Sequence, residues 1–177
     1  MPWFETVTDL AAHAAVVRRR RYGVLEVADG QLAQLRFRPW PTLFAIEEFM
    51  AWQGWRRRNA PGDRCWIYFN QPRRFSQFLA VKFLIATPQV RLATLHAALR
   101  LLDEIARIKG CDALLCDAAN VRLTERLMAR HGWVPHAPSR WHRNFIRRLY
   151  EQPPAPRLSP ELAALLQSAQ QLQSQNA

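Results

Sequence analysis

The most regular hydrophobic pattern in the chain lies in residues 91–109. Apolar residues recur there at steps of three and four, as on the buried face of an amphipathic helix: Leu92, Leu95, Leu99, Leu102, Ile105 and Ile108. Gly110 stands just beyond them and suits the left-handed position after a helix end. The pattern therefore predicts a long helix that ends at Lys109-Gly110.

Four further runs have the character of strands. Residues 78–86 are nearly all apolar apart from Lys82, which predicts a strand in the middle of a sheet. Residues 65–70 predict a strand before it, across the break Gln71-Pro72-Arg73-Arg74. Residues 22–27 and 31–37 predict two strands around Ala28-Asp29-Gly30, and because Asp-Gly suits a turn with positive φ, they are expected to form a β-hairpin.

Two helices are predicted in the first half of the chain. The first covers residues 7–17 and precedes the run Arg18 to Arg21, which we interpret as a solvated face or turn. The second covers residues 42–58, where apolar residues have roughly helical spacing between Pro41 and the breaker Pro61-Gly62.

The second half alternates between strands and helices. Residues 112–117 predict a strand, residues 123–131 a short helix closed by Gly132, and residues 133–135 and 141–150 the last strands. This order predicts an α/β fold with a mixed sheet flanked by helices in one domain over residues 1–150. Residues 151–177 predict a Pro-rich linker and a short C-terminal helix, and this tail either docks through its leucines or stays frayed.

Length and composition limit the class of protein. With 177 residues, 49% of them hydrophobic and 11% aromatic, the chain suits one globular domain and is not mainly disordered. No apolar run approaches the roughly 18 residues that cross a bilayer, and the first ten residues carry two acids where a signal peptide has bases. We therefore expect a cytoplasmic protein that does not enter a membrane.

The cysteines and histidines do not suggest a metal site. Cys65, Cys111 and Cys116 contain no CxxC pair, so neither a disulfide framework nor a structural zinc site is expected. The histidines near the C-terminal half match no metal-ligand spacing. Reduced thiols and no metal are the prediction.

The charge is strongly positive and concentrated. The net charge of +11 comes from 25 basic and 14 acidic residues and favours anionic partners. Residues 121–150 hold seven arginines and one acid; the arginines are Arg122, Arg126, Arg130, Arg140, Arg143, Arg147 and Arg148. Arginine interleaved with Trp141 and Phe145 is typical of a surface that binds single-stranded nucleic acid. Ordinary amphipathic elements that show their polar face to water produce the same pattern.

Two segments carry a family resemblance. Thr87-Pro88-Gln89-Val90-Arg91 precedes the long helix, and Asn120 through Gly132-Trp133 includes the short one. In these segments the chain resembles the GNAT superfamily of acyl-CoA-dependent N-acyltransferases, whose fold runs strand, helix, strand, helix and two strands over this part. The resemblance covers residues 78–149; the early hairpin and the helix at residues 42–58 match the family less well.

The resemblance implies an acyl-CoA site at the start of the long helix. In the family, glycines let backbone amides approach the cofactor diphosphate; here Leu92, Thr94 and His96 fill those positions, and their side chains obstruct such an approach. The implied cofactor-binding residues are Arg91, Leu92, Ala93, Thr94 and Asn120, with acetyl-CoA or another acyl-CoA as cofactor. Arg91 alternatively is a solvated charge that the helix dipole disfavours, and Asn120 a simple helix cap.

The implied chemistry leaves several functions open. A catalytic base near the sheet is best supplied by Asp117 at the end of its strand, although Asp117 alternatively caps the next helix. The Tyr that the family uses on the second helix is replaced by Leu127 or Met128. The first hypothesis is acylation of a small-molecule or protein amine. The alternatives are an inactive GNAT-like module that binds nucleic acid or an acidic protein through Arg122, Arg126, Arg130, Arg140, Arg143 and Arg147, and an interaction protein built on the Leu-rich tail.

Overall fold

The computed structural model describes residues 4–40, 56–117, 125–136 and 144–149. Within them, one sheet has the strand order β1-β3-β2-β4-β5-β6-β8-β7. Its strands are β1 (Glu5–Val7), β2 (Tyr22–Ala28), β3 (Gln31–Arg38), β4 (Arg64–Asn70), β5 (Phe78–Ala86), β6 (Ala113–Asp117), β7 (Val134–Pro135) and β8 (Asn144–Arg148). The helices with described bounds are α1 (Ala14–Arg19), α3 (Leu92–Ile108) and α4 (Glu125–Arg130).

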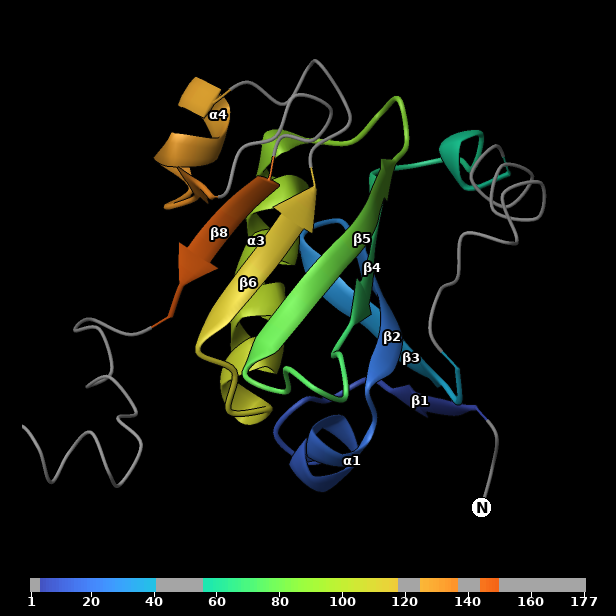
Figure 1. Cartoon of the computed structure of the whole chain (residues 1–177). Helices are drawn as coiled ribbons and strands as arrows, with labels where there is room; N and C mark the ends of the chain where they lie inside the picture. Colours follow the sequence, from blue (N-terminus) through green and yellow to red (C-terminus); the bar gives the residue numbers. More distant parts are fainter. Residues whose placement is uncertain (1–3, 41–55, 118–124, 137–143, 150–177) are drawn as a thin grey trace, which may run out of the picture.

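Helix α3 covers one face of this sheet and supplies much of the core (Figure 1). Leu102 and Ile105 are fully buried against core residues such as Phe69 and Leu114. Each such side chain stabilises the fold by roughly 1.5–3 kcal/mol through burial. Gly110 has φ +67 after the helix, which confirms the predicted C-terminal stop. Leu92 differs from the predicted stripe, because it lies 61% exposed in the first turn.

The predicted hairpin and central strands are confirmed. β2 and β3 pair antiparallel around Asp29 and Gly30, whose φ angles of 49° and 77° suit a tight hairpin turn. β5 lies between β4 and β6, as its apolar run predicted. β6 runs parallel to β5 after the α3 crossover, whereas the other described pairs are antiparallel, so the sheet is mixed and the fold is α/β.

The prediction of a helix over residues 7–17 is wrong at its start. Val7 is the last residue of β1, where it pairs with Leu35 and is buried. The Asp9 carboxylate accepts hydrogen bonds from the amides of Ala11 and Ala12 in a turn, so α1 begins only at Ala14. Val7 and Leu10 are both buried, and their three-residue spacing resembles that of a helix. Val7 nevertheless belongs to a strand and Leu10 to a turn.

The basic run after α1 is partly engaged in ion pairs. Arg19 and Arg20 contact the Glu5 carboxylate at 3.1 and 2.7 Å, and the Arg20 side chain is only 17% exposed. Lys109 donates hydrogen bonds to the carbonyls of Val17 and Arg20, and burial lowers the pKa of this amine to about 8. These contacts join the end of α1 to β1 and to the end of α3, so part of the run is structural.

The remaining predictions agree with the structure as far as it extends. After β5 the elements follow in the order α3, β6, α4, β7, β8, as the resemblance implied. Of the helix predicted at residues 42–58, only residues 56–58 are described, and they are helical. The tail after Leu149 lies outside the described residues, so the domain division stays a prediction. Among described helices, none has the length and apolar character needed to span a bilayer.

Candidate functional site

Strands β5 and β6 separate toward their carboxyl ends (Figure 1). Their parallel ladder ends at Val81 and Cys116, although β5 continues to Ala86. At the same point, Phe69 of β4 pairs with Val81 and the preceding Tyr68 pairs with Phe83, which leaves Lys82 as a bulge. Because a bulge bends its strand and increases the local twist, Lys82 marks the place where β5 leaves β6.

Apolar side chains are exposed along this diverging part of β5. Leu84 pairs with Ile67, so the two side chains share the face that α3 covers. Ile67 is fully buried, yet Leu84 is 43% exposed, because β6 does not continue beside it. Because the two strands separate, the apolar side chain of Leu84 remains exposed.

A carboxylate from another part of the chain caps the start of α3. Asp63, just before β4, accepts a hydrogen bond from the Arg91 amide at 2.8 Å and one from the Thr94 hydroxyl at 2.6 Å. The Asp63 side chain is only 6% exposed. The hydrogen bond from Thr94, together with those from Arg91, lowers the pKa of Asp63 against the opposing effect of burial. Asp63 thus satisfies part of the helix N-terminus internally.

Arg91 is held at this helix start by two acids. Its Nε lies 2.8 Å from Asp63 Oδ2, and its Nη2 lies 3.2 Å from Asp29 Oδ1 at the β2–β3 turn. These carboxylates explain how a cation remains at a helix end whose dipole disfavours it. The Arg91 side chain is nevertheless 70% exposed, so its guanidinium remains accessible to a ligand.

The first turn of α3 still has amides without a partner. Among the described residues, no acceptor bonds the amides of Leu92 and Ala93, whereas those of Thr94 and Leu95 donate to the Arg91 carbonyl. The helix is 17 residues long, and the amides at its start together with its dipole favour an anion. This turn follows β5 directly through residues 87–91, so the free amides adjoin the place where the strands separate.

Substitution of Asp63 tests the internal cap. We expect Asp63→Asn to lower the melting temperature by about 4 °C at pH 7, because a weakened cap loosens the start of α3. The folded-state pKa of Asp63 lies below its ordinary value of 3.8, so its contribution is present above that value and is lost as the pH falls through the folded-state pKa. The melting temperatures of variant and parent should therefore converge in acid. An equal difference at pH 7 and pH 2.5 contradicts this assignment.

The structure places the other predicted site residues as follows. Asp117 is the last residue of β6 and pairs with Asn144. Thr94 is buried, with its hydroxyl turned to Asp63. Met128 lies in the core cluster. The predicted residues Asn120, Arg122, Arg140 and Arg143 lie outside the described residues, as do the side chains of Asp117 and Leu127.

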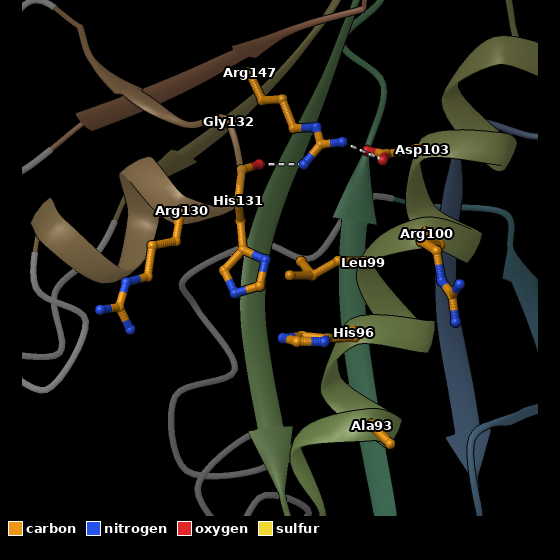
Figure 2. A pocket seen from close by; sticks show the side chains of 9 residues that line it. All are labelled: Ala93, His96, Leu99, Arg100, Asp103, Arg130, His131, Gly132 and Arg147. Atoms are coloured by element: carbon orange, nitrogen blue, oxygen red, sulfur yellow. Dashed lines mark hydrogen bonds and ion pairs between the residues drawn. The ribbon is translucent and has the colours of Figure 1, made fainter.

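A groove of about 670 Å³ runs between α3 and the segment that follows α4 (Figure 2). It brings together two of the predicted arginines, Arg130 and Arg147, but the exposed Arg126 does not line it. Arg147 Nη2 lies 2.6 Å from the buried Asp103 carboxylate, and its Nη1 donates to the His131 carbonyl. Arg147 therefore neutralises an internal acid and adds little free charge to the surface.

Sequence reasoning missed both acids that organise this region. Asp63 and Arg91 are separated by 28 positions in the sequence, and Asp103 and Arg147 by 44. Asp103 looked like an ordinary polar residue of the amphipathic helix. The one available signal was the helix start itself, where an arginine without a local acid indicates that a distant carboxylate is needed.

Comparisons with known proteins concern the fold. No family model matches the chain, and neither does any curated protein. Among solved structures, a nourseothricin acetyltransferase is similar over 84% of this chain and 100% of its own, with 13% identity and a TM-score of 0.41. A putative acetyltransferase from Salmonella typhimurium, yncA with its cofactor acetyl-CoA, is similar over 89% and 100%, with 13% identity and a TM-score of 0.43. From the order of its elements between β5 and β8, we conclude that the chain has a GNAT-like fold.

Proposed function

We propose that the protein is an acyl-CoA-dependent N-acyltransferase that transfers an acyl group to an amine. The observation that carries this proposal is the separation of β5 from β6 beside the unpartnered amides of Leu92 and Ala93. An acyl-CoA molecule combines an anionic diphosphate with an extended arm that ends in a thioester. These features match the anion-binding turn and the open strand edge next to it.

The first turn of α3 would hold the diphosphate. The amides of Leu92 and Ala93 are available as donors, and the exposed Arg91 guanidinium adds a positive charge beside them. Thr94, at one of the substituted glycine positions, turns its side chain inward to Asp63 and leaves this surface open. Leu92 is exposed and therefore free to move away from an approaching phosphate, and the exposed His96 has its ring against that of His131.

The open edge of β5 would hold the extended arm. Beyond Val81, the backbone of β5 has no ladder partner on the β6 side among the described residues, and such an edge binds an extended chain through its amides and carbonyls. Leu84 offers an apolar contact next to that edge. The bound thioester would supply an acyl group already activated for attack by an amine.

Asp117 is the proposed general base. It lies at the carboxyl end of β6, on the strand whose separation from β5 forms the open edge. A carboxylate there would accept the proton that the amine loses when it attacks the thioester. Asn120, three residues further on, would contact the cofactor in this proposal.

A thermal-shift titration with acetyl-CoA tests binding by the complete protein. At one hundred times the dissociation constant, binding stabilises the native state by about 2.7 kcal/mol and should raise the melting temperature by about 5–10 °C. ATP at the same concentration is the control for general attraction between an anion and a basic protein. Release of free thiol with a panel of amines then tests turnover. No shift with saturating acetyl-CoA contradicts the proposal, and a salt series with a single-stranded oligonucleotide would then test the nucleic-acid alternative.

A further inference from the structure

The groove between α3 and the segment that follows α4 is lined by cationic and titratable side chains that the proposed transfer reaction does not use (Figure 2). The imidazole rings of His96 and His131 lie with their centroids 4.9 Å apart at an interplanar angle of 65°. Arg100, one turn beyond His96 on α3, and Arg130, next to His131, line the same groove. His96 and Arg100 belong to α3, Arg130 ends α4 and His131 follows it, and all four residues line one open space. In Figure 2 the guanidinium groups of Arg100 and Arg130 lie on opposite sides of the two imidazole rings.

The charge of this groove is not balanced by the protein. In the described part of the chain, Arg100 and Arg130 make no hydrogen bond or ion pair. The acid that lines the groove, Asp103, is already bound by Arg147 at 2.6 Å. Two arginines are therefore available to an external anion, beside two histidines that can add positive charge.

We propose that this groove is a proton-linked binding site for a doubly charged tetrahedral oxyanion, that is, a phosphoryl or sulfuryl group. Arg100 and Arg130 supply permanent positive charge, and His131 gains charge by taking up a proton as the anion binds. The groove adjoins the first turn of α3 at Ala93, but its charged side chains are separate from the backbone amides that would bind the diphosphate.

The electrostatics of the histidine pair explain the link to protons. Burial lowers the pKa of His131, and the positive neighbours His96, Arg147 and Arg130 lower it further. The charged groups that face the pair are Arg100 and Asp103 from α3, Arg130 from α4 and Arg147 from β8. A dianion among them offsets the repulsion that opposes protonation of His131, so anion binding raises the pKa of His131 and a lower pH strengthens anion binding.

The phosphoryl group could come from either of two sources with the same chemistry. The groove also includes Ala93, whose amide belongs to the first turn of α3, so a terminal phosphate of bound CoA is one source. A separate small phosphorylated or sulfated molecule is the other. Comparison of CoA with dephospho-CoA distinguishes them, because only CoA carries the terminal phosphomonoester.

An NMR titration of the histidine Cε1 protons tests the site. The complete protein is titrated between pH 5 and 8 in sodium sulfate and in sodium chloride of equal ionic strength. Sulfate keeps its double charge over this range, so any pH dependence belongs to the protein. We expect sulfate to raise the pKa of His131 by about one unit, which corresponds to about tenfold tighter sulfate binding at the acidic end. Equal histidine pKa values in both salts overturn the proposal.

Matched variants distinguish binding at this site from the general attraction of anions to a basic protein. Arg100→Gln and Arg130→Gln should each abolish most of the sulfate-dependent pKa change. Arg107→Gln, on the same helix but outside the groove, should keep it. Loss of the effect in Arg107→Gln, or its survival in the other two variants, contradicts the site.

Titrations with CoA and with dephospho-CoA identify the source of the phosphoryl group. If CoA raises the pKa of His131 and dephospho-CoA does not, the groove binds the terminal phosphate of CoA. If sulfate acts and neither coenzyme does, the groove binds a separate ligand. Both results support the oxyanion site when sulfate also raises the His131 pKa, and the absence of a sulfate effect overturns it. Because sulfate binding is measured without acyl-CoA, failure of the proposed transferase activity leaves this test intact.

Discussion

Replacement of Arg147 by Gln is expected to lower the free energy of unfolding by about 3 kcal/mol at pH 7, because it leaves a buried carboxylate without its counter-ion. Asp103 is 5% exposed, and Arg147 Nη2 lies 2.6 Å from its Oδ2. Within the part of the chain that the structure describes, the side-chain oxygen Oδ1 of Asp103 has no hydrogen-bond partner. Urea unfolding of the variant and the parent measures the difference.

The effect of Arg147→Gln should depend on pH. Burial raises the pKa of Asp103 above its ordinary value, and the attraction to Arg147 opposes that rise. An acid with a raised folded-state pKa is more favourable when protonated, so stability falls as the pH rises through that pKa. Without Arg147 this fall becomes larger, and the variant should lose most stability near neutral pH and least near pH 4.

A double variant provides the control for this prediction. Asp103→Asn combined with Arg147→Gln removes both charges and should recover much of the stability that the single Arg147→Gln variant loses. If the single variant loses the same stability at pH 4 and pH 7, or if the double variant is no more stable than the single one, the buried ion pair does not have the assigned role.

Leu92→Pro is expected to weaken acetyl-CoA binding by about tenfold to a hundredfold, because it removes one amide that would donate to the charged diphosphate. The substitution suits this position. Leu92 is the first residue of α3, where proline is favoured, and it is 61% exposed. Arg91 before it has φ −86° and ψ 151°, the extended conformation that a following proline requires.

Leu92→Ala is the matched control, since it removes the same side chain and keeps the amide. Both variants should have melting temperatures close to that of the parent, and calorimetric titration should show weak acetyl-CoA binding in Leu92→Pro alone. Equal dissociation constants for the two variants would show that the amide of residue 92 does not contact the ligand.

Local sequence patterns predicted those elements that depend on the conformational preferences of neighbouring residues. The hairpin at Asp29-Gly30 and the helix stop at Gly110 depend on positive φ angles that those residues adopt readily. The central place of β5 followed from its apolar run. Lys82, the one charged residue in that run, coincides with the bulge where β5 leaves β6. The interruption of the apolar run therefore lies at the place where the two strands separate.

The candidate site was less predictable because its contacts span long stretches of sequence. The Asp63 cap on α3 and the Asp103–Arg147 pair each join segments that only the folded sheet brings together. Val7 shows the same limit on a smaller scale, since its apolar side chain suits either a helix or the edge strand β1. Arg91 lies at the start of α3, where the sequence pattern predicted the helix to begin, and its two acidic partners were visible only in the fold.

The most direct test of diphosphate binding at the first turn of α3 is a ¹⁵N–¹H correlation spectrum of the protein titrated with acetyl-CoA. The amide resonances of Leu92 and Ala93 should move most, together with those of residues 82–86 on the open edge of β5. Saturating acetyl-CoA that leaves these resonances unmoved, while others shift or none do, would contradict cofactor binding at this turn.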